Sequence, residues 1–253
     1  MSDFQSAGIG ARDPAAAAVG LFAHHAVQAR QPGDHIADFV DEFDNRILIR
    51  TANEAQHHRR ASSLIQRRYA WRGYATSASE STPEGRMTFS ACTGDNTVAT
   101  LTAGLDAGKG LYVGNVYPEV VADLREEGRK LCEFTRLAVD ESVRSHLVLG
   151  SIIHVAFMYV IDVHGCTDVL IEVNPRHVRF YQRMLGFNVA AEQRDDPAVG
   201  APAVLLRLDL AHCANEIARI GGNRRSGGQE RSYYSFFFPR AEAARIVGRL
   251  RSR

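Results

Sequence analysis

Residues 131–139 read LCEFTRLAV, residues 145–164 read SHLVLGSIIHVAFMYVIDVH, and residues 168–173 read DVLIEV. The first and third runs are short and rich in apolar residues, which is typical of buried strands. The middle run is apolar on nearly every side, as in a buried helix, and at fewer than the roughly 20 apolar residues that a bilayer requires it does not predict a membrane span. Strand, helix and strand in this order predict a parallel βαβ unit with a right-handed crossover.

Further strands and helices are predicted on both sides of this unit. A strand at 46–50 precedes a helix at 53–74, and strands at 87–92 and 97–102 form a hairpin around the turn residues 93–96. Pro118 at the start and Gly128 just past the end predict a short helix at 118–127. Asn174-Pro175 begins another helix, which Gly186 ends, and a strand at 204–208 and a terminal helix at 239–253 follow.

The predicted fold class is therefore α/β (α+β), with a mixed, mostly antiparallel central sheet, a parallel βαβ core and helices on both faces. We expect the domain to span residues 41–253. Residues 1–40 are rich in Ala, Gly and Pro, and they are predicted to form a partly flexible extension with a short helix at 14–30.

Composition sets limits on function. A chain of 253 residues with 45% hydrophobic content can bury a substantial core, and its net charge of +1 gives no reason to expect a nucleic-acid partner. The four cysteines are widely spaced, and no pair of histidines has metal-ligand spacing, so neither a metal site nor a disulfide framework is predicted. With no export signal at the start of the chain, we expect a cytoplasmic protein.

Three segments carry a family resemblance: LIQRRYAWRGY at 64–74, CEFTRLAVD at 132–140 and NPRHVRFYQRMLGF at 174–187. The last segment and the order of elements resemble the GNAT acyltransferase superfamily. Together the three segments resemble the N-acyl amino acid synthases (FeeM-type) within it, over roughly residues 45–210. Glu133 and Arg136 also match the Glu-x-x-Arg of the related acyl-homoserine lactone synthases.

The resemblance implies transfer of a long-chain fatty acyl group from an acyl carrier protein thioester to the amine of a small amino-acid acceptor. It implies no bound cofactor, since the donor is the acyl-phosphopantetheine of the carrier protein, with acyl-CoA as the alternative. Acetyl-CoA enzymes cradle the pyrophosphate in a glycine-rich loop, but residues 143–150 read VRSHLVLG here. This departure favours the carrier protein and leaves Arg144 and Ser145 as the predicted phosphate contacts.

The first candidate for a general base is Glu133, because burial in an apolar strand would raise its pKa. The structural alternative is an ion pair with Arg136. Residues three apart point to opposite faces of a regular strand, so a shared site requires a bulge, which we predict near Thr135. The bulge would free backbone N–H groups around Arg136 to Ala138 for an oxyanion, and it places Thr135, Leu137 and Ala138 at the substrate.

The motif at 174–187 supplies the remaining candidates. Tyr181 matches the tyrosine that protonates the leaving sulfur in many GNAT enzymes, although a core tyrosine is an equal alternative. Asn174 is either a contact to the pantetheine arm or a helix cap, and the cap is the simpler explanation. Arg176 and His177 are assigned to substrate binding with it.

Basic and aromatic residues near the end of the first long helix are predicted to cover the acyl channel or to dock an acidic carrier protein: Arg67, Arg68, Tyr69, Trp71, Arg72 and Tyr74. A solvated helix face is the structural alternative. The arginines of the terminal helix suggest peripheral membrane contact or an acidic partner, and Phe236 to Phe238 either anchor that contact or pack inside the domain.

Two other functions remain open at this stage. One is an acyl-homoserine lactone synthase-like enzyme, which would also require S-adenosylmethionine. The other is a non-catalytic acyl-binding or regulatory module on the same fold, since a fold does not determine a function.

Overall fold

The computed structural model describes residues 35–52, 54–70, 73, 84–107, 110–223 and 232–252. The helix predicted at 14–30 lies outside these residues, as does most of the extension predicted at 1–40. Residues Ala37–Val40 form strand β1, which pairs with β2, so this end of the predicted extension belongs to the sheet.

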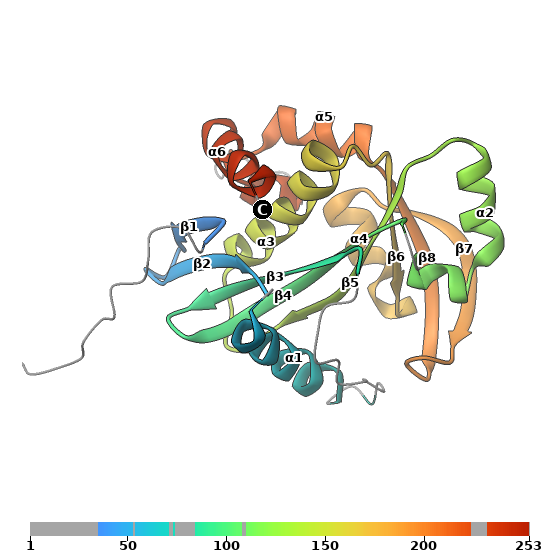
Figure 1. Ribbon diagram of the computed structural model, residues 1–253, viewed down its shortest axis with the longest axis horizontal. Helices are drawn as coiled ribbons and strands as arrows, with labels where there is room; N and C mark the ends of the chain where they lie inside the picture. Colours follow the sequence, from blue (N-terminus) through green and yellow to red (C-terminus); the bar gives the residue numbers. More distant parts are fainter. Residues whose placement is uncertain are drawn as a thin grey trace, which may run out of the picture. The chain divides into compact units, whose positions relative to one another are not determined.

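One eight-stranded sheet organises the domain, in the order β1-β2-β3-β4-β5-β6-β8-β7 (Figure 1). Every neighbouring pair is antiparallel except β5 and β6, which are parallel. The fold class predicted from the sequence is thus confirmed. The remaining strands are β2 Arg46–Thr51, β3 Arg86–Thr93, β4 Asn96–Leu105, β5 Leu131–Val139, β6 Asp168–Val173, β7 Asn188–Asp196 and β8 Ala201–Asp209.

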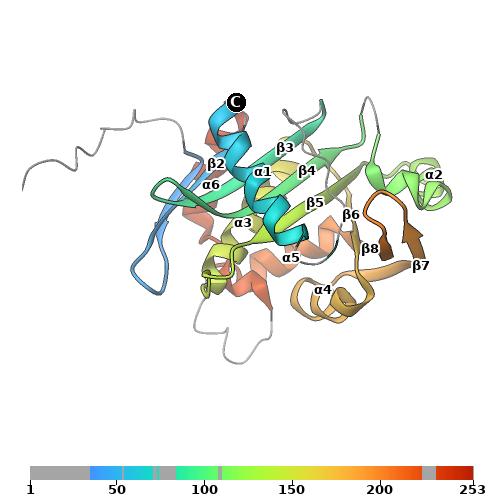
Figure 2. The same cartoon turned by 90° about the horizontal axis from the view of Figure 1, so that it is seen from below.

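Helices cover both faces of the sheet (Figures 1 and 2). Helices α1 (Ala55–Ala70) and α2 (Pro118–Glu126) pack on one face through Leu64 and Leu124, among others. The opposite face carries the larger core, to which the other helices contribute. They are α3 His146–Met158 with its π-helical end Tyr159–Val163, α4 Val178–Leu185, α5 Leu210–Ile220 and α6 Arg240–Arg251.

Helix α3 is the buried crossover of the βαβ unit. Ser145 caps it by accepting a hydrogen bond from the backbone N–H of Val148 at 3.2 Å. Its window His146–Val163 is long and apolar enough to cross a bilayer by composition alone, but 72% of that window is buried inside the domain. The helix therefore serves as the core of the fold.

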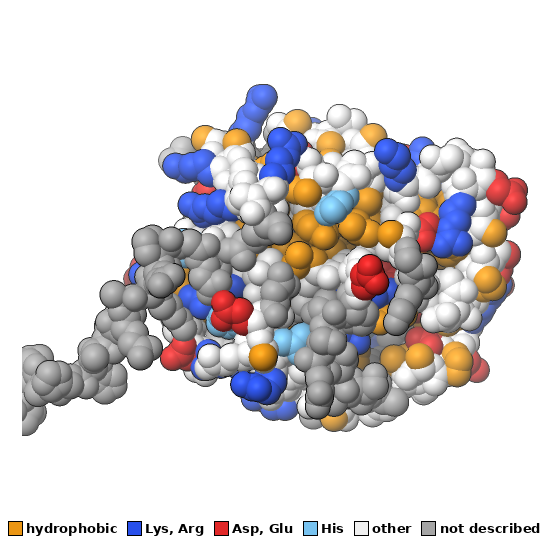
Figure 3. Space-filling view, in the orientation of Figure 1, with side chains coloured by type: hydrophobic (Ala, Val, Ile, Leu, Met, Phe, Trp, Pro, Cys, Tyr) orange, Lys and Arg blue, Asp and Glu red, His pale blue; other side chains and the backbone are white. Residues whose placement is uncertain are grey.

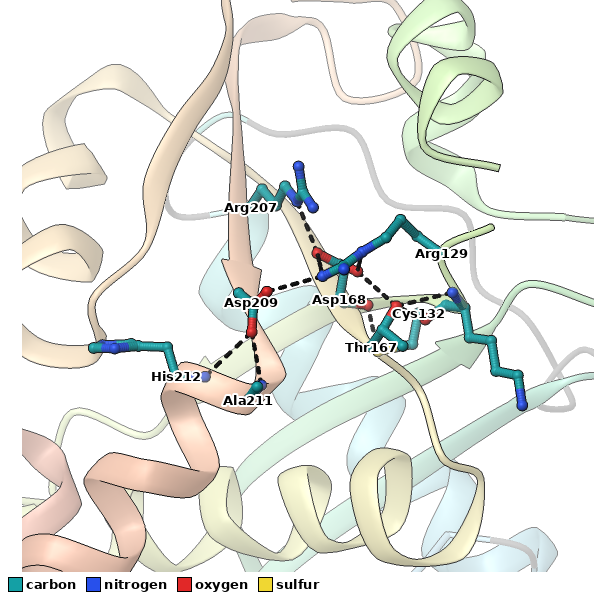
Figure 4. A network of polar contacts seen from close by, with 9 residues as sticks. Arg129, Cys132, Thr167, Asp168, Arg207, Asp209, Ala211 and His212 are labelled. Atoms are coloured by element: carbon teal, nitrogen blue, oxygen red, sulfur yellow. Dashed lines mark hydrogen bonds and ion pairs between the residues drawn. The ribbon is translucent and has the colours of Figure 1, made fainter. Parts of the chain in front are cut away.

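The ladder between the parallel strands β5 and β6 is short. Strands β5 and β6 pair from Leu131 to Glu133 with Asp168 to Leu170, and the ladder does not extend further along these two strands. An ion-pair network secures the paired end: Arg129 and Arg207 both bind the fully buried Asp168, at 2.5 and 2.8 Å, and Arg129 also binds Asp209 (Figure 4). The other ends of the two strands diverge.

The C-terminal segment packs into the domain. Phe237 and Phe238 are buried, and the ring of Phe237 stacks on His154 of α3 with centroids 4.5 Å apart. These two rings are therefore not available as a membrane anchor, and of the two interpretations the intramolecular one is correct. Arginine side chains project over α6 on the face shown in Figure 3.

Candidate active site

A cavity of about 430 Å³ lies where β5 and β6 diverge. Residues 134–137 of β5 and residues 171–174 at the end of β6 face each other across it. Because the strands separate here, the cavity is lined by side chains from both faces of the sheet. Its volume lies within the range of small-molecule sites in proteins.

One part of the lining is apolar and belongs to the core between the sheet and helices α3 and α4. All of its members are at most 9% exposed: Leu101, Phe134, Ile153, Phe157, Ile171, Leu185 and Phe187. No sequence pattern marks this set, because a side chain that lines a channel and one that fills a core have the same chemistry and spacing.

A β-bulge interrupts β5 at the cavity. Thr135 pairs with Thr102 and Ala138 with Thr100, so Arg136 and Leu137 together face Leu101 of β4. Arg136 has φ +53°, in the left-handed region that a non-glycine residue rarely adopts. The hydroxyl of Thr100 donates to the Arg136 carbonyl at 3.0 Å. The bulge predicted near Thr135 is confirmed, one residue further along.

Two buried polar atoms in the cavity wall lack a hydrogen-bond partner among the described residues: Thr135 Oγ1 and Glu172 Oε1. Burial raises the pKa of Glu172 to about 7, with further contributions from the negative charges of Asp196 and Glu133. Sequence reasoning missed Glu172. The available signal was one carboxylate inside the otherwise apolar run 169–173.

Glu133 lies on the same face of the sheet as Glu172, but its surroundings differ. It is fully buried, pairs with Arg86 of β3, and accepts backbone hydrogen bonds from Tyr112 and Val113 at 2.9 and 3.0 Å. The pair spans Gly104 of β4, where an added Cβ would lie 2.5 Å from an Arg86 nitrogen. A strand residue without a side chain is what allows the two charged groups to meet.

This arrangement corrects the structural interpretation of Glu133. Its ion-pair partner is Arg86 rather than Arg136, because the bulge turns Arg136 toward the cavity while Glu133 faces β3 across Gly104. Glu133 does not line the cavity, and its oxygens are engaged by three donors. This geometry supports a structural role and gives no support to its assignment as the base.

The cavity brings together about half of the residues predicted from the sequence: Tyr69, Thr135, Arg136, Leu137, Asn174, His177 and Tyr181. Asn174 is also a helix cap, since its side chain accepts a hydrogen bond from the backbone N–H of Arg176. Ala138 packs against Leu64 and Ile65 of α1 instead. The side chain of Arg176 contacts His177.

The basic residues of α1 have a local role in the structure. Arg67 lies 3.5 Å from Asp140, and Arg68 lies 3.3 Å from Glu141, so both contact the turn that follows β5. Tyr69, one residue on, lines the cavity. The predicted Trp71, Arg72 and Tyr74 lie outside the described residues.

The predicted phosphate contacts lie apart from this cavity, at the N-terminus of α3. There the carboxylate of Glu42 accepts hydrogen bonds from the Ser145 hydroxyl at 2.6 Å and from the backbone N–H of His146 at 3.1 Å. Leu147 and Val148 point into the core. An internal carboxylate, rather than bulky side chains, therefore occupies the position that favours an anion. Arg144 is exposed nearby.

Chemically, the cavity combines an apolar interior with a titratable carboxylate, a hydroxyl that has no partner among the described residues and an irregular strand backbone. It can hold an apolar group next to a polar group that exchanges a proton. Among the described residues, no group of three or more His, Cys, Asp or Glu side chains is arranged to hold a metal ion.

Several solved structures are similar to this chain. The solved structure of FeeM, an N-acyl amino acid synthase from uncultured soil microbes, matches with a TM-score of 0.62 and 25% identity, over 69% of this chain and 95% of that one. A putative N-acetyltransferase from Lactobacillus plantarum matches with a TM-score of 0.47 and 17% identity over 65% of this chain and 98% of that one. The acyl-homoserine lactone synthase LasI matches with a TM-score of 0.45 and 12% identity, over 66% of this chain and 91% of that one.

A search of curated proteins found no match. The model of the family described as N-acyl amino acid synthase FeeM matches residues 60–209, which is more than half of the chain and includes all of β5 and β6. The chain therefore belongs to the FeeM family of N-acyl amino acid synthases, which are acyltransferases.

Proposed function

We propose that this acyltransferase moves a long-chain fatty acyl group from an acyl carrier protein thioester to the amine of an amino acid. The observation that carries the proposal is the cavity at the divergence of β5 and β6, which joins an apolar interior on one face of the sheet to polar groups on the other. Such a cavity can hold a chain and a polar acceptor on opposite sides of one reacting carbon.

The acyl chain occupies the apolar interior. Phe134, Ile153 and Phe157 line it, and all three also belong to the main core. Each methylene removed from water contributes about 0.8 kcal/mol, so a long chain gains several kcal/mol over an acetyl group in the same place. This difference supports a long-chain donor.

The thioester carbonyl lies at the bulge of β5. Attack on it produces an oxyanion, which is stabilised by donors fixed in advance. Arg136 and Leu137 interrupt the regular ladder there, and we assign their N–H groups, together with the hydroxyl of Thr135, as the donors. Tyr181 lines the same cavity, and we assign to it the return of a proton to the leaving sulfur.

The acceptor enters at the polar end. The side chains of Glu172 and Asp196 line that end, and Arg136 lines the same cavity. An α-amino acid carries an ammonium and a carboxylate on the same carbon atom, and these match the two acids and the guanidinium. Arg136 is thus assigned to the acceptor carboxylate.

The donor is presented by a carrier protein rather than as free CoA. Glu42 occupies the N-terminus of α3, so a pyrophosphate would have to displace a carboxylate held by two hydrogen bonds. A carrier protein presents a single phosphate, and exposed arginines such as Arg144 and those of α6 offer contacts for its acidic surface.

The test is to incubate the purified protein with dodecanoyl- or hexadecanoyl-carrier protein and all twenty amino acids, and to identify N-acyl products by mass spectrometry. We expect a long-chain N-acyl amino acid from the carrier-bound donor and much less from the matching acyl-CoA or from acetyl-carrier protein. Product formed only from acetyl donors would contradict the assignment of the apolar interior to the chain.

A pair of variants tests the position of the chain. Ile153→Phe fills the cavity, and we expect the preferred donor to become shorter by several carbons. Ile152→Phe is the matched control, because Ile152 is equally buried on the same helix but does not line the cavity. Both changes overpack the core, at about 1–3 kcal/mol each. Equal chain-length profiles for the two variants would place the chain elsewhere.

A further inference from the structure

Glu172 is a carboxylate whose environment no structural role explains. It projects from β6 into the cavity, and its buried Oε1 has no hydrogen-bond partner among the described residues. Burying such a group without a partner costs stability, and proteins retain that cost mainly where the group does chemistry. Asp168, on the same strand, shows the contrast, since two arginines and the hydroxyl of Thr167 satisfy it.

We propose that Glu172 is the general base of the reaction, which takes the proton from the acceptor's ammonium at the polar end of the cavity. This inference rests on the proposed transfer to an amine. It assigns the catalytic proton to a residue of β6 and leaves Glu133 of β5 as a structural group.

The acids around Glu172 select a cationic acceptor. Asp196, at the end of β7, lines the same cavity, is 8% exposed and accepts a hydrogen bond from the backbone N–H of Ala198 at 2.8 Å. Two carboxylates at one end of a cavity attract an ammonium group and disfavour an anionic head group. The acceptor class is therefore a primary amine that arrives protonated.

The charged and titratable groups that face Glu172 come from several elements. Asp196 lies on β7, and Tyr117 directly precedes α2. Glu133 lies on β5, and its partner Arg86 lies on β3. Arg136, His177 and Tyr181 line the same cavity. The hydroxyl of the buried Tyr117 donates a hydrogen bond to the carbonyl of Ala203 at 2.8 Å, so this hydroxyl is engaged away from Glu172. Burial and these negative neighbours raise the pKa of Glu172, and an ammonium bound beside it stabilises the carboxylate that acts as the base.

The step balances as follows. The carboxylate of Glu172 removes one proton from the ammonium and leaves a neutral amine. The nitrogen lone pair attacks the thioester carbon, the C–N bond forms, and the C–S bond breaks as the tetrahedral intermediate collapses. The second proton lost by nitrogen goes to the departing thiolate, and Glu172 releases its proton to solvent.

The experiment compares the wild-type protein with Glu172→Gln in the carrier-protein assay between pH 5 and pH 9. The wild-type kcat/KM should rise with pH as the base ionises, and the substitution should lower it by about 10²-fold or more and remove that rise. Glu192→Gln is the matched control, since Glu192 is exposed on β7, and its profile should match the wild type. A Glu172→Gln enzyme with the wild-type rate and profile would overturn the proposal.

A second measurement separates this inference from the proposed function. In a thermal-shift titration with n-butylamine, which carries no carboxylate, the wild type should be stabilised, and Glu172→Gln should lose most of the shift. If no N-acyl product forms but the amine effect depends on Glu172, the proposed reaction fails and the amine subsite stands. If n-butylamine shifts neither protein, or shifts both equally, Glu172 does not receive the amine.

Discussion

Two acidic residues on neighbouring strands have opposite environments. Glu133 on β5 and Glu172 on β6 lie on the same face of the sheet, on either side of the point where the strands separate. Glu133 has an arginine and two backbone N–H groups as partners, whereas Glu172 has a buried oxygen with none among the described residues. The first is held in one position, and the second is able to accept a proton.

A carboxylate within a family motif is therefore not always the reactive one. The Glu133 pair fixes the loop that contains Tyr112 and Val113, and both of these residues line the cavity. Glu133 therefore shapes the wall of the site, while Glu172 lies inside it. The following predictions test this division, beginning with the largest expected effect.

Glu133→Gln should produce the largest loss of stability. It leaves the buried Arg86 without its counter-charge, and breaking a buried pair by removing one partner costs about 3–5 kcal/mol. For a chain of this size the Tm should fall by roughly 10 °C in differential scanning calorimetry. The double variant Glu133→Gln/Arg86→Met should recover part of this loss, and a single variant as stable as the wild type would remove the structural role.

Glu172→Gln should change stability in the opposite direction, and the effect should depend on pH. The folded-state pKa of Glu172, about 7, is above its ordinary value of 4.5, so the folded protein binds this proton more tightly than the unfolded chain. The wild type therefore loses stability as pH rises from 4.5 to about 7, and the variant does not.

Because Glu172 is partly exposed, solvent reduces the effect, and we expect the Tm of the variant to exceed that of the wild type by roughly 2–4 °C at pH 8. At pH 5 the two values should converge. A variant less stable than the wild type at pH 8 would show that the carboxylate has a stabilising partner.

Asp196→Asn should produce the smallest of the three effects. It removes one of the negative charges that raise the pKa of Glu172, while the amide oxygen can still accept the hydrogen bond from Ala198. The rise of kcat/KM with pH should move to lower pH, and the KM for the amine should increase. Asp195→Asn, a change at an exposed neighbour on β7, is the control. Equal profiles for the two variants would exclude Asp196 from the subsite.

Much of the fold could be predicted from the sequence because local patterns specify it. The runs 131–139 and 168–173 form strands, Asn174 caps and Gly186 ends a helical segment, and the hairpin turns at 93–96 as predicted. Strand β7 was missed because it is an exposed edge strand, and its run of charged residues lacks apolar alternation. Helix α5 was missed although the Asp209 side chain caps it by accepting hydrogen bonds from the backbone N–H groups of Ala211 and His212.

The site was harder to predict because its key contacts join residues that are distant in the sequence. The Arg86–Glu133 pair depends on the register of three strands and on Gly104 between them. The contact of Glu42 with α3 joins residues more than a hundred positions apart. The role of Glu172 depends on which partners it lacks, and no sequence pattern encodes this.

The most direct test of this division is a titration of the side-chain carboxyl groups by carbon-13 NMR on protein labelled at the glutamate carboxyl carbon. The resonance that disappears in Glu172→Gln identifies Glu172, and we predict that in the wild type it titrates with a pKa of about 7. A Glu172 resonance that titrates in the ordinary range of an exposed glutamate would contradict the account, because the residue would then have partners or solvent that the structure does not give it.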